Sequence, residues 1–593
     1  MSDLRESPLA KKAGHLALRV FAHLKRRIQS SELWFILLAA GIGLVAGAAS
    51  AVLAHTAHAI QRLLYGFSAD MRLSALPEIV PWRLVALPLG GAVLALIRVI
   101  WPNRTRAPID VIEANALYGG RIPLRDSLVV SLQTLVSNGF GASVGLEAAF
   151  AQTGGGGVAS KVGQWLNLKR SSLRTLVGAG AGSAIAAAFG APLAGAFYAF
   201  EVVLGGYTIA ALAPVAAASL AAVLAAQWMG AEPFVIASTA RREIALSGYL
   251  LYALLGAISA GLGILIMRLI AVFETLTRRI PVSDVWRPVL GGLCLVPIAF
   301  FAPAALSSGH GAMTLYMAQQ STIVAILVVL VLKLMASIVS LSFGFRGGLF
   351  FASLFVGALL GMAFAQVVNL IYPEANLDTT NAALVGMAAL AAAVIGGPMC
   401  MSMMVLSVTN DFALTAAVVT AALVSTAVIR ERFGYSFSTW RLHLRGEAIK
   451  TARDIGWVRT HTALNLMRKN NVTMSDHASI ADLRAQVALG STNRVLLVDS
   501  HGDYRGLVPT AEAYIAGVDT DTPLSQLAKQ TEVYVRPDMD IAAIQRVFEH
   551  FSVDDLAVVD EHHKLLGMLT ERYVNRRYAE ALEQAQREFF GEM

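Results

Sequence analysis

Two glycine-rich stretches inside apolar sequence decide the fold of this chain: Gly141-Ala-Ser-Val-Gly-Leu-Glu-Ala-Ala149 and Gly344-Phe-Arg-Gly-Gly-Leu-Phe-Phe-Ala352. Glycine breaks in a lipid-facing helix would leave backbone groups unpaired, so they are tolerated only where they are buried in protein or line a cavity. A helix that begins inside the membrane offers free N–H groups and the positive end of its dipole, and both favour negative charge. The two stretches therefore predict broken helices and an anion site.

The composition excludes several classes of protein. The chain has 593 residues, of which 56% are hydrophobic and 15% are charged, and its mean hydropathy is +0.60. A soluble globular chain would carry about 25% charged residues. The deficit excludes a soluble enzyme, a disordered scaffold and a fibrous repeat, and it indicates a membrane protein with several spans.

The charged residues are distributed unevenly, which divides the chain into four expected parts. Residues 1–32 are polar and basic without a cleavage site, so we expect a cytoplasmic amphipathic helix and not a removed signal peptide. Residues 33–444 are apolar, with Lys and Arg beside the spans, and form the expected transmembrane domain. A linker at 445–470 leads to an acidic region of ordinary composition at 471–593. The pI of about 9.4 reflects the flanks of the spans and not a nucleic-acid partner.

Helix breaks recur in the two halves of the apolar part. Gly190-Ala-Pro192 opens one apolar run and Gly396-Gly-Pro398 opens another, and Glu201 and Ser407 stand equally far after the two prolines. Matching broken helices in two halves are typical of a transporter whose binding site lies between them. We therefore predict an all-α polytopic membrane domain built as an inverted repeat.

A second repeat occupies the acidic region, over approximately 471–522 and 531–585. Three residues of the first copy recur at a constant interval in the second, so that Ile480, Asp499 and Gly506 correspond to Ile541, Asp560 and Gly567. Each copy reads as a helix, a β-rich run ending in Asp, a turn, a second strand and another helix. This α/β pattern resembles a tandem pair of CBS domains, which form an intramolecular regulatory module.

Metal and disulfide sites are not expected. The two cysteines, Cys294 and Cys400, lie in apolar segments far from any second Cys or His with ligand spacing. We interpret both as small buried hydrophobic residues. The pair His562-His563 falls in an expected exposed turn, and we interpret it as inert.

The membrane and C-terminal parts together resemble the CLC family of chloride channels and proton-coupled chloride exchangers, over about residues 30–585. Gly145-Leu-Glu-Ala-Ala149 resembles the family's Gly-Arg-Glu-Gly-Pro stretch, which places Glu147 on its gating glutamate. A lone carboxylate in an apolar run is expensive and marks a functional site. At a helix N-terminus it can occupy the anion's own position, and protonation would release that position. The resemblance implies anion contacts at the neighbouring Leu146 and Ala148.

Two other stretches resemble the family's anion-coordinating segments. Gly348-Leu-Phe-Phe-Ala352 resembles Gly-x-Phe-x-Pro, and this assigns the backbone N–H groups of Leu349 and Phe350 to the central anion. Arg104-Thr-Arg-Ala-Pro108 occupies the place of Gly-Ser-Gly-Ile-Pro, so that Thr105 substitutes for the coordinating Ser.

The inner end of the expected pore differs from the exchangers of the family. Phe437-Ser-Thr-Trp-Arg-Leu442 resembles the stretch with the anion-coordinating, pore-closing Tyr, whose position falls on Ser438, with Tyr435 as the alternative. The residue Val202 stands where exchangers usually carry a second, proton-passing Glu, and family channels also carry Val there. Its neighbour Glu201 matches a residue that supports the helix. These two substitutions favour passive, channel-like anion conduction, with a proton-coupled anion exchanger as the alternative.

Two rival classes lack the residues they need. A CBS-bearing metal-cation transporter would need clustered carboxylates in the membrane, whereas Glu147 and Glu201 are far apart in the sequence. Ser308 and His310 could form the catalytic pair of a membrane enzyme, but the loop that carries them offers no third catalytic residue. We therefore expect a transport protein and not an enzyme.

The CBS resemblance implies regulation and leaves the ligand open. Family members that bind adenine nucleotides carry a hydroxyl and a carboxylate after the second strand, but each copy here keeps only one of them, Glu512 in the first and Thr570 in the second. Coupling between two subunits needs no ligand. The resemblance further implies a homodimer in the cell inner or plasma membrane, with the N-terminus and the CBS pair in the cytoplasm.

Overall fold

The computed structural model describes residues 27, 31–101, 108–231, 244, 246–319, 321–444, 462–577 and 580. Most of the helix expected at 1–32, and the linker from 445 to 461, lie outside these ranges. The chain divides into two compact units, Met1–Asp454 and Ile455–Met593.

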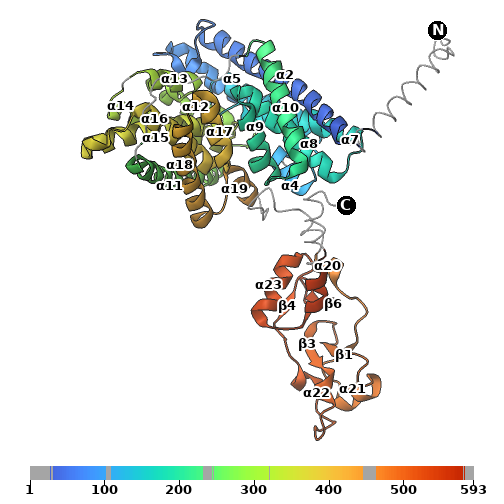
Figure 1. The fold of residues 1–593 in the computed structure, drawn as a ribbon. Coiled ribbons are helices and arrows are strands. Elements are labelled where there is room, and N and C mark those ends of the chain that lie inside the picture. Colours follow the sequence, from blue (N-terminus) through green and yellow to red (C-terminus); the bar gives the residue numbers. More distant parts are fainter. Residues whose placement is uncertain are drawn as a thin grey trace, which may run out of the picture. The chain divides into compact units, whose positions relative to one another are not determined.

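The first half of the membrane unit runs from α2 to α10 (Figure 1). Its elements are α2 (Glu32–Tyr65), η1 (Leu73–Ala75), η2 (Pro81–Val85), α3 (Ala86–Ile100), α4 (Val111–Leu117), α5 (Leu124–Gly139), α6 (Glu147–Ala151), η3 (Gln152–Ser160), α7 (Lys161–Trp165), α8 (Arg170–Phe189), α9 (Pro192–Tyr198), η4 (Ala199–Leu204) and α10 (Ile209–Trp228).

The second half runs from α11 to α19. Its elements are α11 (Leu246–Arg278), α12 (Arg287–Phe301), η5 (Pro303–Ala305), α13 (His310–Ala318), α14 (Ile323–Ser342), α15 (Phe350–Ile371), η6 (Pro373–Ala375), α16 (Thr379–Ile395), α17 (Pro398–Thr409), α18 (Phe412–Arg432) and α19 (Phe437–Leu444).

The membrane unit is helical throughout the residues that the structure describes. In the described part of the chain, eight helices are long and apolar enough to cross a bilayer, and shorter apolar helices such as α9, α16 and α17 pack between them. Short helices at membrane depth are the broken helices that the glycine and proline pattern predicted. The predicted all-α polytopic architecture is confirmed.

The predicted helix breaks lie at equivalent points of the two halves. The helix α8 ends at Gly190 with φ of 65°, and α9 begins at Pro192; α16 ends at Gly396 with φ of 87°, and α17 begins at Pro398. A left-handed glycine terminates a helix without a Cβ clash, and proline suits a first helical turn whose N–H groups are unpaired. The local sequence therefore sets each break.

The two glycine-rich stretches meet where the halves face each other. Gly145 N–H donates to Gly348 O at 2.9 Å, and Gly348 N–H donates to Gly145 O at 3.2 Å, so the two stretches run antiparallel. Each stretch follows a glycine with positive φ, 91° at Gly141 and 94° at Gly344. An antiparallel meeting of equivalent segments is what an inverted repeat requires.

In each half, a serine side chain accepts a backbone N–H from the glycine-rich stretch of the other half. Ser143 N–H donates to Ser340 Oγ at 3.0 Å, and Arg346 N–H donates to Ser137 Oγ at 2.9 Å. Because buried backbone N–H groups need partners, these bonds replace the regular pairing that the breaks remove. The cross-bonds fix the two stretches against each other.

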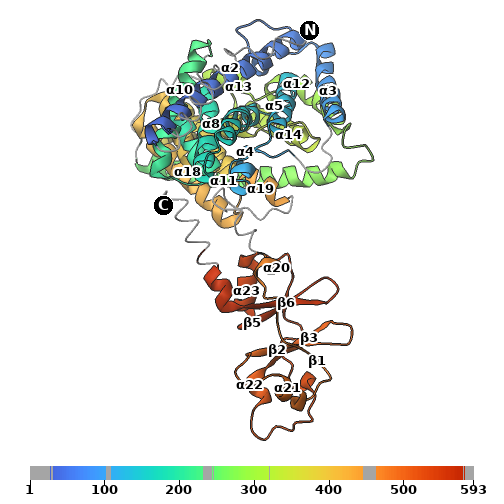
Figure 2. The ribbon, with the colours of Figure 1, turned by 90° about the vertical axis from the view of Figure 1, so that its right-hand side faces the viewer.

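The C-terminal unit contains two small sheets, which Figure 2 shows beside their helices. Their strands are β1 (Thr473–Ser475), β2 (Arg494–Val498) and β3 (Tyr504–Pro509), then β4 (Tyr534–Val535), β5 (Asp555–Val559) and β6 (Leu565–Thr570). The helical elements are α20 (Ala463–Leu466), α21 (Ile480–Gln486), α22 (Thr510–Ala513), η7 (Leu524–Leu527) and α23 (Ile541–Phe551). In each sheet the middle strand pairs parallel with one neighbour and antiparallel with the next strand in sequence.

In both sheets an aspartate carboxylate accepts backbone N–H groups of the hairpin turn, at the position that the repeat predicted. Asp499 accepts the N–H groups of His501 at 2.8 Å and Asp503 at 3.0 Å, and Asp560 accepts those of His562 and Lys564, each at 2.8 Å. The N–H of Asp503, aided by Arg505, lowers the pKa of Asp499 to about 2. The pKa of Asp560 is lowered in the same way by the N–H of Lys564. The same turn chemistry in both copies supports the predicted duplication.

We predict that Gly344→Ala lowers the unfolding temperature of the full-length protein in detergent. The positive φ disfavours any Cβ, at a cost of about 1–2 kcal/mol, and an added Cβ would meet the Arg98 guanidinium at 2.8 Å, which bonds Gly344 O. Gly261→Ala is the matched control, since no atom lies within 4 Å of its Cβ on the exposed side of α11. Equal unfolding temperatures for the two variants would contradict the prediction.

Candidate functional site

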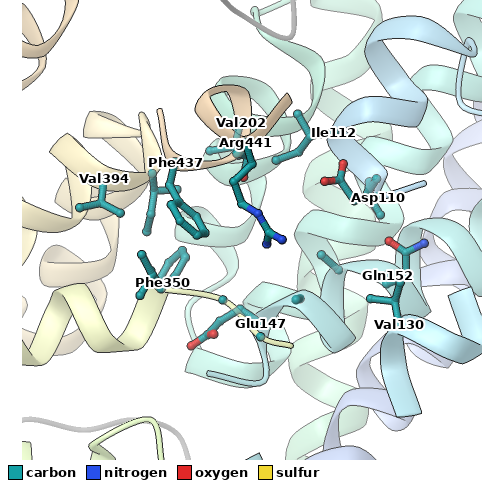
Figure 3. A pocket seen from close by; sticks show the side chains of 18 of the residues that line it. Asp110, Ile112, Val130, Glu147, Gln152, Val202, Phe350, Val394, Phe437 and Arg441 are labelled. Carbon is teal, nitrogen blue, oxygen red and sulfur yellow. The ribbon is translucent and has the colours of Figure 1, made fainter. Parts of the chain in front are cut away.

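A cavity of about 130 Å³ lies where the broken helices of the membrane unit converge (Figure 3). Its walls come from the start of α4, the start of α6, the junction of α9 and η4, the stretch before α15, the end of α16, and α19. Segments from both halves therefore enclose one space. This is the arrangement that the two glycine-rich stretches predicted.

Glu147 forms part of the wall and is buried, with 5% of its surface exposed. It is the first residue of α6, yet its Oε1 accepts the N–H of Phe351, at the start of α15 in the other half, at 3.1 Å. Its Oε2 has no hydrogen-bond partner among the described residues. A carboxylate thus occupies the N-terminus of α15, a position that suits any anion.

Two glycines make room for this carboxylate. A Cβ built on Gly145 would overlap Oε2 of Glu147, and its nearest neighbours are all carboxylate atoms of that side chain. A Cβ on Gly348 would stand 2.9 Å from the same oxygen. The glycines of the bridge between the halves are therefore required by the position of Glu147, as well as by the backbone.

Positively charged side chains also border the cavity. Arg441 extends from α19 toward the space between Glu147 and Asp110, as Figure 3 shows, and Arg346 belongs to the stretch before α15. Asp110 lines the cavity while it caps α4, where its Oδ1 accepts Glu113 N–H at 2.7 Å. A low-dielectric wall with guanidinium groups concentrates anions.

Val202 and Glu201, which the sequence analysis placed at the inner end of the expected pore, lie in different environments. Val202 lines the cavity. Glu201 does not, because its carboxylate accepts the N–H groups of Met399 at 3.2 Å and Cys400 at 2.9 Å at the start of α17, and the hydroxyl of Tyr207 at 2.9 Å. This geometry is that of a helix-supporting residue.

The candidate Ser438 lines the cavity, whereas its alternative Tyr435 does not. The ring of Tyr435 packs against Phe433, Trp440 and His443 instead. The buried Tyr198 of α9 also lines the cavity, with its ring centroid 6.1 Å from that of Phe350.

The remaining anion candidates are placed unequally. Ala148, Leu349 and Phe350 line the cavity, and Leu146 stands just before α6 without lining it. Thr105 lies outside the described residues. The first N–H groups of α6 and α15 have no partners within their own helices, and among them the N–H of Phe351 is donated to Glu147.

Among the lining residues that sequence reasoning missed, four carry a titratable side chain: Asp110, Tyr198, Arg346 and Arg441. Arg346 lies within one of the quoted stretches, and a charge inside an apolar run was an available signal for it. Arg441 also lies within a quoted stretch, 437–442, whereas Asp110 and Tyr198 reach the cavity only through the meeting of distant segments.

The C-terminal unit has a cavity of its own, of about 590 Å³. Thr570 lines it, but Glu512 does not and pairs with Lys529. Asp555 also lines it, and burial raises the pKa of this carboxyl despite Arg494 at 3.1 Å. Among the described ranges, no group of three or more His, Cys, Asp or Glu residues could hold a metal ion, and Cys294 and Cys400 are unpaired thiols. Cys400 is buried as expected, but Cys294 is exposed, which corrects the expectation that both are buried.

Comparison with known sequences gives a consistent picture. The family profile described as "Voltage gated chloride channel" matches residues 89–430, and the CBS domain profile matches residues 518–580. The "Voltage-gated ClC-type chloride channel ClcB" of Escherichia coli O17:K52:H18 is 25% identical over 401 residues, which are 67% of this chain and 95% of that protein.

Comparison with solved structures shows the same fold. A slow cyanobacterial Cl⁻/H⁺ antiporter is 20% identical with a TM-score of 0.61, over 69% of this chain and 97% of that one. A CLC-type fluoride/proton antiporter is 23% identical with a TM-score of 0.57, over 68% and 97%. A eukaryotic CLC transporter is 15% identical with a TM-score of 0.59, over 91% and 97%.

Proposed function

Because this chain belongs to the voltage gated chloride channel family, an anion-transport family whose profile matches more than half of its length, we propose that it conducts small anions passively, under the control of Glu147. The expected CLC-like membrane domain and CBS region are thereby confirmed at the level of the family. The passive mode and the role of each residue are the proposal.

The position of the Glu147 carboxylate carries this proposal. It holds the N–H of Phe351 at the N-terminus of α15, which is where a permeating anion would be bound. Protonation removes the negative charge of the carboxylate and releases the N–H of Phe351, so an anion can bind there instead. The backbone N–H groups of Leu349, Phe350 and Ala148 then contact the anion.

The lining of the inner wall supports passive conduction. Val202 is apolar and cannot carry a proton, and Glu201 is engaged with the start of α17. Ser438 is small and stands where the family carries its pore-closing Tyr, and the ring of Phe437 is the aromatic group that α19 contributes to the cavity. The relative ClcB is itself named as a channel.

A proton-coupled exchanger is the second candidate, and one observation favours it. Asp110 is the other carboxylate that lines the cavity, so it could accept a proton in place of the missing glutamate at 202. In that mechanism each proton passes between Asp110 and Glu147 as anions move the opposite way.

Simultaneous chloride and proton fluxes distinguish the two mechanisms. The full-length protein is reconstituted in liposomes with a chloride gradient and no proton gradient. We expect chloride to flow with no stoichiometric proton movement, because Val202 cannot carry a proton at the position of the second glutamate. Uphill proton movement that Asp110→Asn abolishes would establish the exchanger and contradict passive conduction.

We predict that Gly145→Ala raises chloride flux at neutral pH and flattens its rise at low pH. The three atoms nearest to the added Cβ all belong to the carboxylate of Glu147, so the variant displaces that carboxylate and imitates a released gate. Glu147→Gln should give the same flat profile, and the double variant should add nothing further. A wild-type pH profile in Gly145→Ala or Glu147→Gln would count against Glu147 as the gate.

We predict that Arg441→Gln lowers chloride flux by roughly tenfold at low ionic strength, since a charged wall raises local anion concentration. The loss should shrink as salt screens the charge. Arg432→Gln is the matched control, because Arg432 is exposed at the end of α18 and does not line the cavity. Equal losses in the two variants would show a general charge effect and not a cavity role.

The C-terminal pair is proposed as a cytoplasmic regulator of a homodimer in the inner or plasma membrane. Thr570, which lines the 590 Å³ cavity, is its candidate ligand contact, whereas the pairing of Glu512 with Lys529 argues for coupling between subunits without an adenine nucleotide.

A further inference from the structure

A buried lysine stands behind the site and has no part in the function proposed above. Lys333 lies in the middle of α14 with none of its surface exposed. Its Nζ donates to Ser143 Oγ at 2.9 Å, to Ala305 O at 3.2 Å and to Ser307 O at 2.7 Å. All three hydrogen atoms of the ammonium group are used, and all three acceptors are neutral.

The charge of this ammonium group is not balanced nearby. No Asp or Glu oxygen of the described residues lies within 4.0 Å of Lys333 Nζ. Hydrogen bonds to neutral oxygens satisfy the donors, but burying a charge remains costly unless an opposite charge compensates it. The three hydrogen bonds alone therefore do not explain why a charged lysine is buried at this position.

The contacts of Lys333 lead directly to the site. Ser143 stands four residues before Glu147, and three residues of α14 hold it: Lys333, Ser337 through Oγ at 3.0 Å, and Ser340 through the backbone N–H of Ser143 at 3.0 Å. Ser143 therefore connects the Lys333 ammonium group to the glycine-rich stretch that carries Glu147. Glu147 is thus the anionic group that the structure offers to Lys333.

We propose that Lys333 is the fixed positive charge that balances whichever single negative charge occupies the start of α15, either the Glu147 carboxylate or a permeating monovalent anion. The inference rests on the proposed anion conduction. An empty site would leave the ammonium uncompensated in a low-dielectric interior, so the carboxylate leaves most readily as an anion arrives. One fixed charge of this kind favours monovalent over divalent anions.

The test measures chloride binding to the full-length protein by calorimetry, in a Glu147→Gln background that frees the site. Lys333→Gln keeps hydrogen-bonding capacity without the charge, and we expect it to weaken chloride binding by roughly tenfold. Lys333→Arg should retain affinity near that of the background. Ser143→Ala removes the hydrogen bonds of Ser143 Oγ to Lys333 and Ser337 but keeps the charge, and it should also leave affinity close to the background value.

A second variant covers the case in which Lys333→Gln does not fold. Ser337→Asp places a carboxylate one helical turn from Lys333, pairs with the ammonium and should weaken chloride binding to the same degree. Background affinity in either folded charge-neutralising variant would overturn the proposal while leaving anion conduction intact. A Glu147→Gln protein that neither binds nor conducts chloride would instead refute the proposed function, and the inference with it.

Discussion

Among the hydrogen bonds that join the two halves of the membrane unit, one involves a charged group that lines the cavity. The N–H of Phe351, at the start of a helix in the second half, is donated to the carboxylate of Glu147, at the start of a helix in the first half. Each helix end lies inside the membrane unit, where its first N–H groups have no partner within their own helix. A negative group is favoured there, and the protein supplies one that can be neutralised.

The geometry around this bond explains why so much of the surrounding sequence is small. Gly145 and Gly348 pair the two stretches through their backbones, and neither can carry a Cβ without meeting the carboxylate. Ser137 and Ser340 hold the stretch of the opposite half. Flexible glycines and serine cross-bonds together keep one carboxylate at one helix end, and the cavity forms around it.

The sequence predicted what is encoded locally. Gly190 and Gly396 with the prolines after them predicted the breaks in both halves, because glycine and proline act through their own backbone geometry. Glu147 was identifiable because a lone carboxylate in an apolar run is costly. The sequence did not decide whether Ser438 or Tyr435 faces the cavity, because both residues lie on one short segment. Asp110 and Tyr198 were missed, because their places at the cavity depend on how distant helices meet.

The central claim is that the Glu147 carboxylate and a permeating anion compete for one place. A calorimetric titration of chloride into the full-length protein at neutral pH, compared between wild type and Glu147→Gln, tests it most directly. The account predicts that Glu147→Gln binds chloride at least roughly tenfold more tightly, a gain of about 1.4 kcal/mol. Equal affinities in the two proteins would contradict the claim.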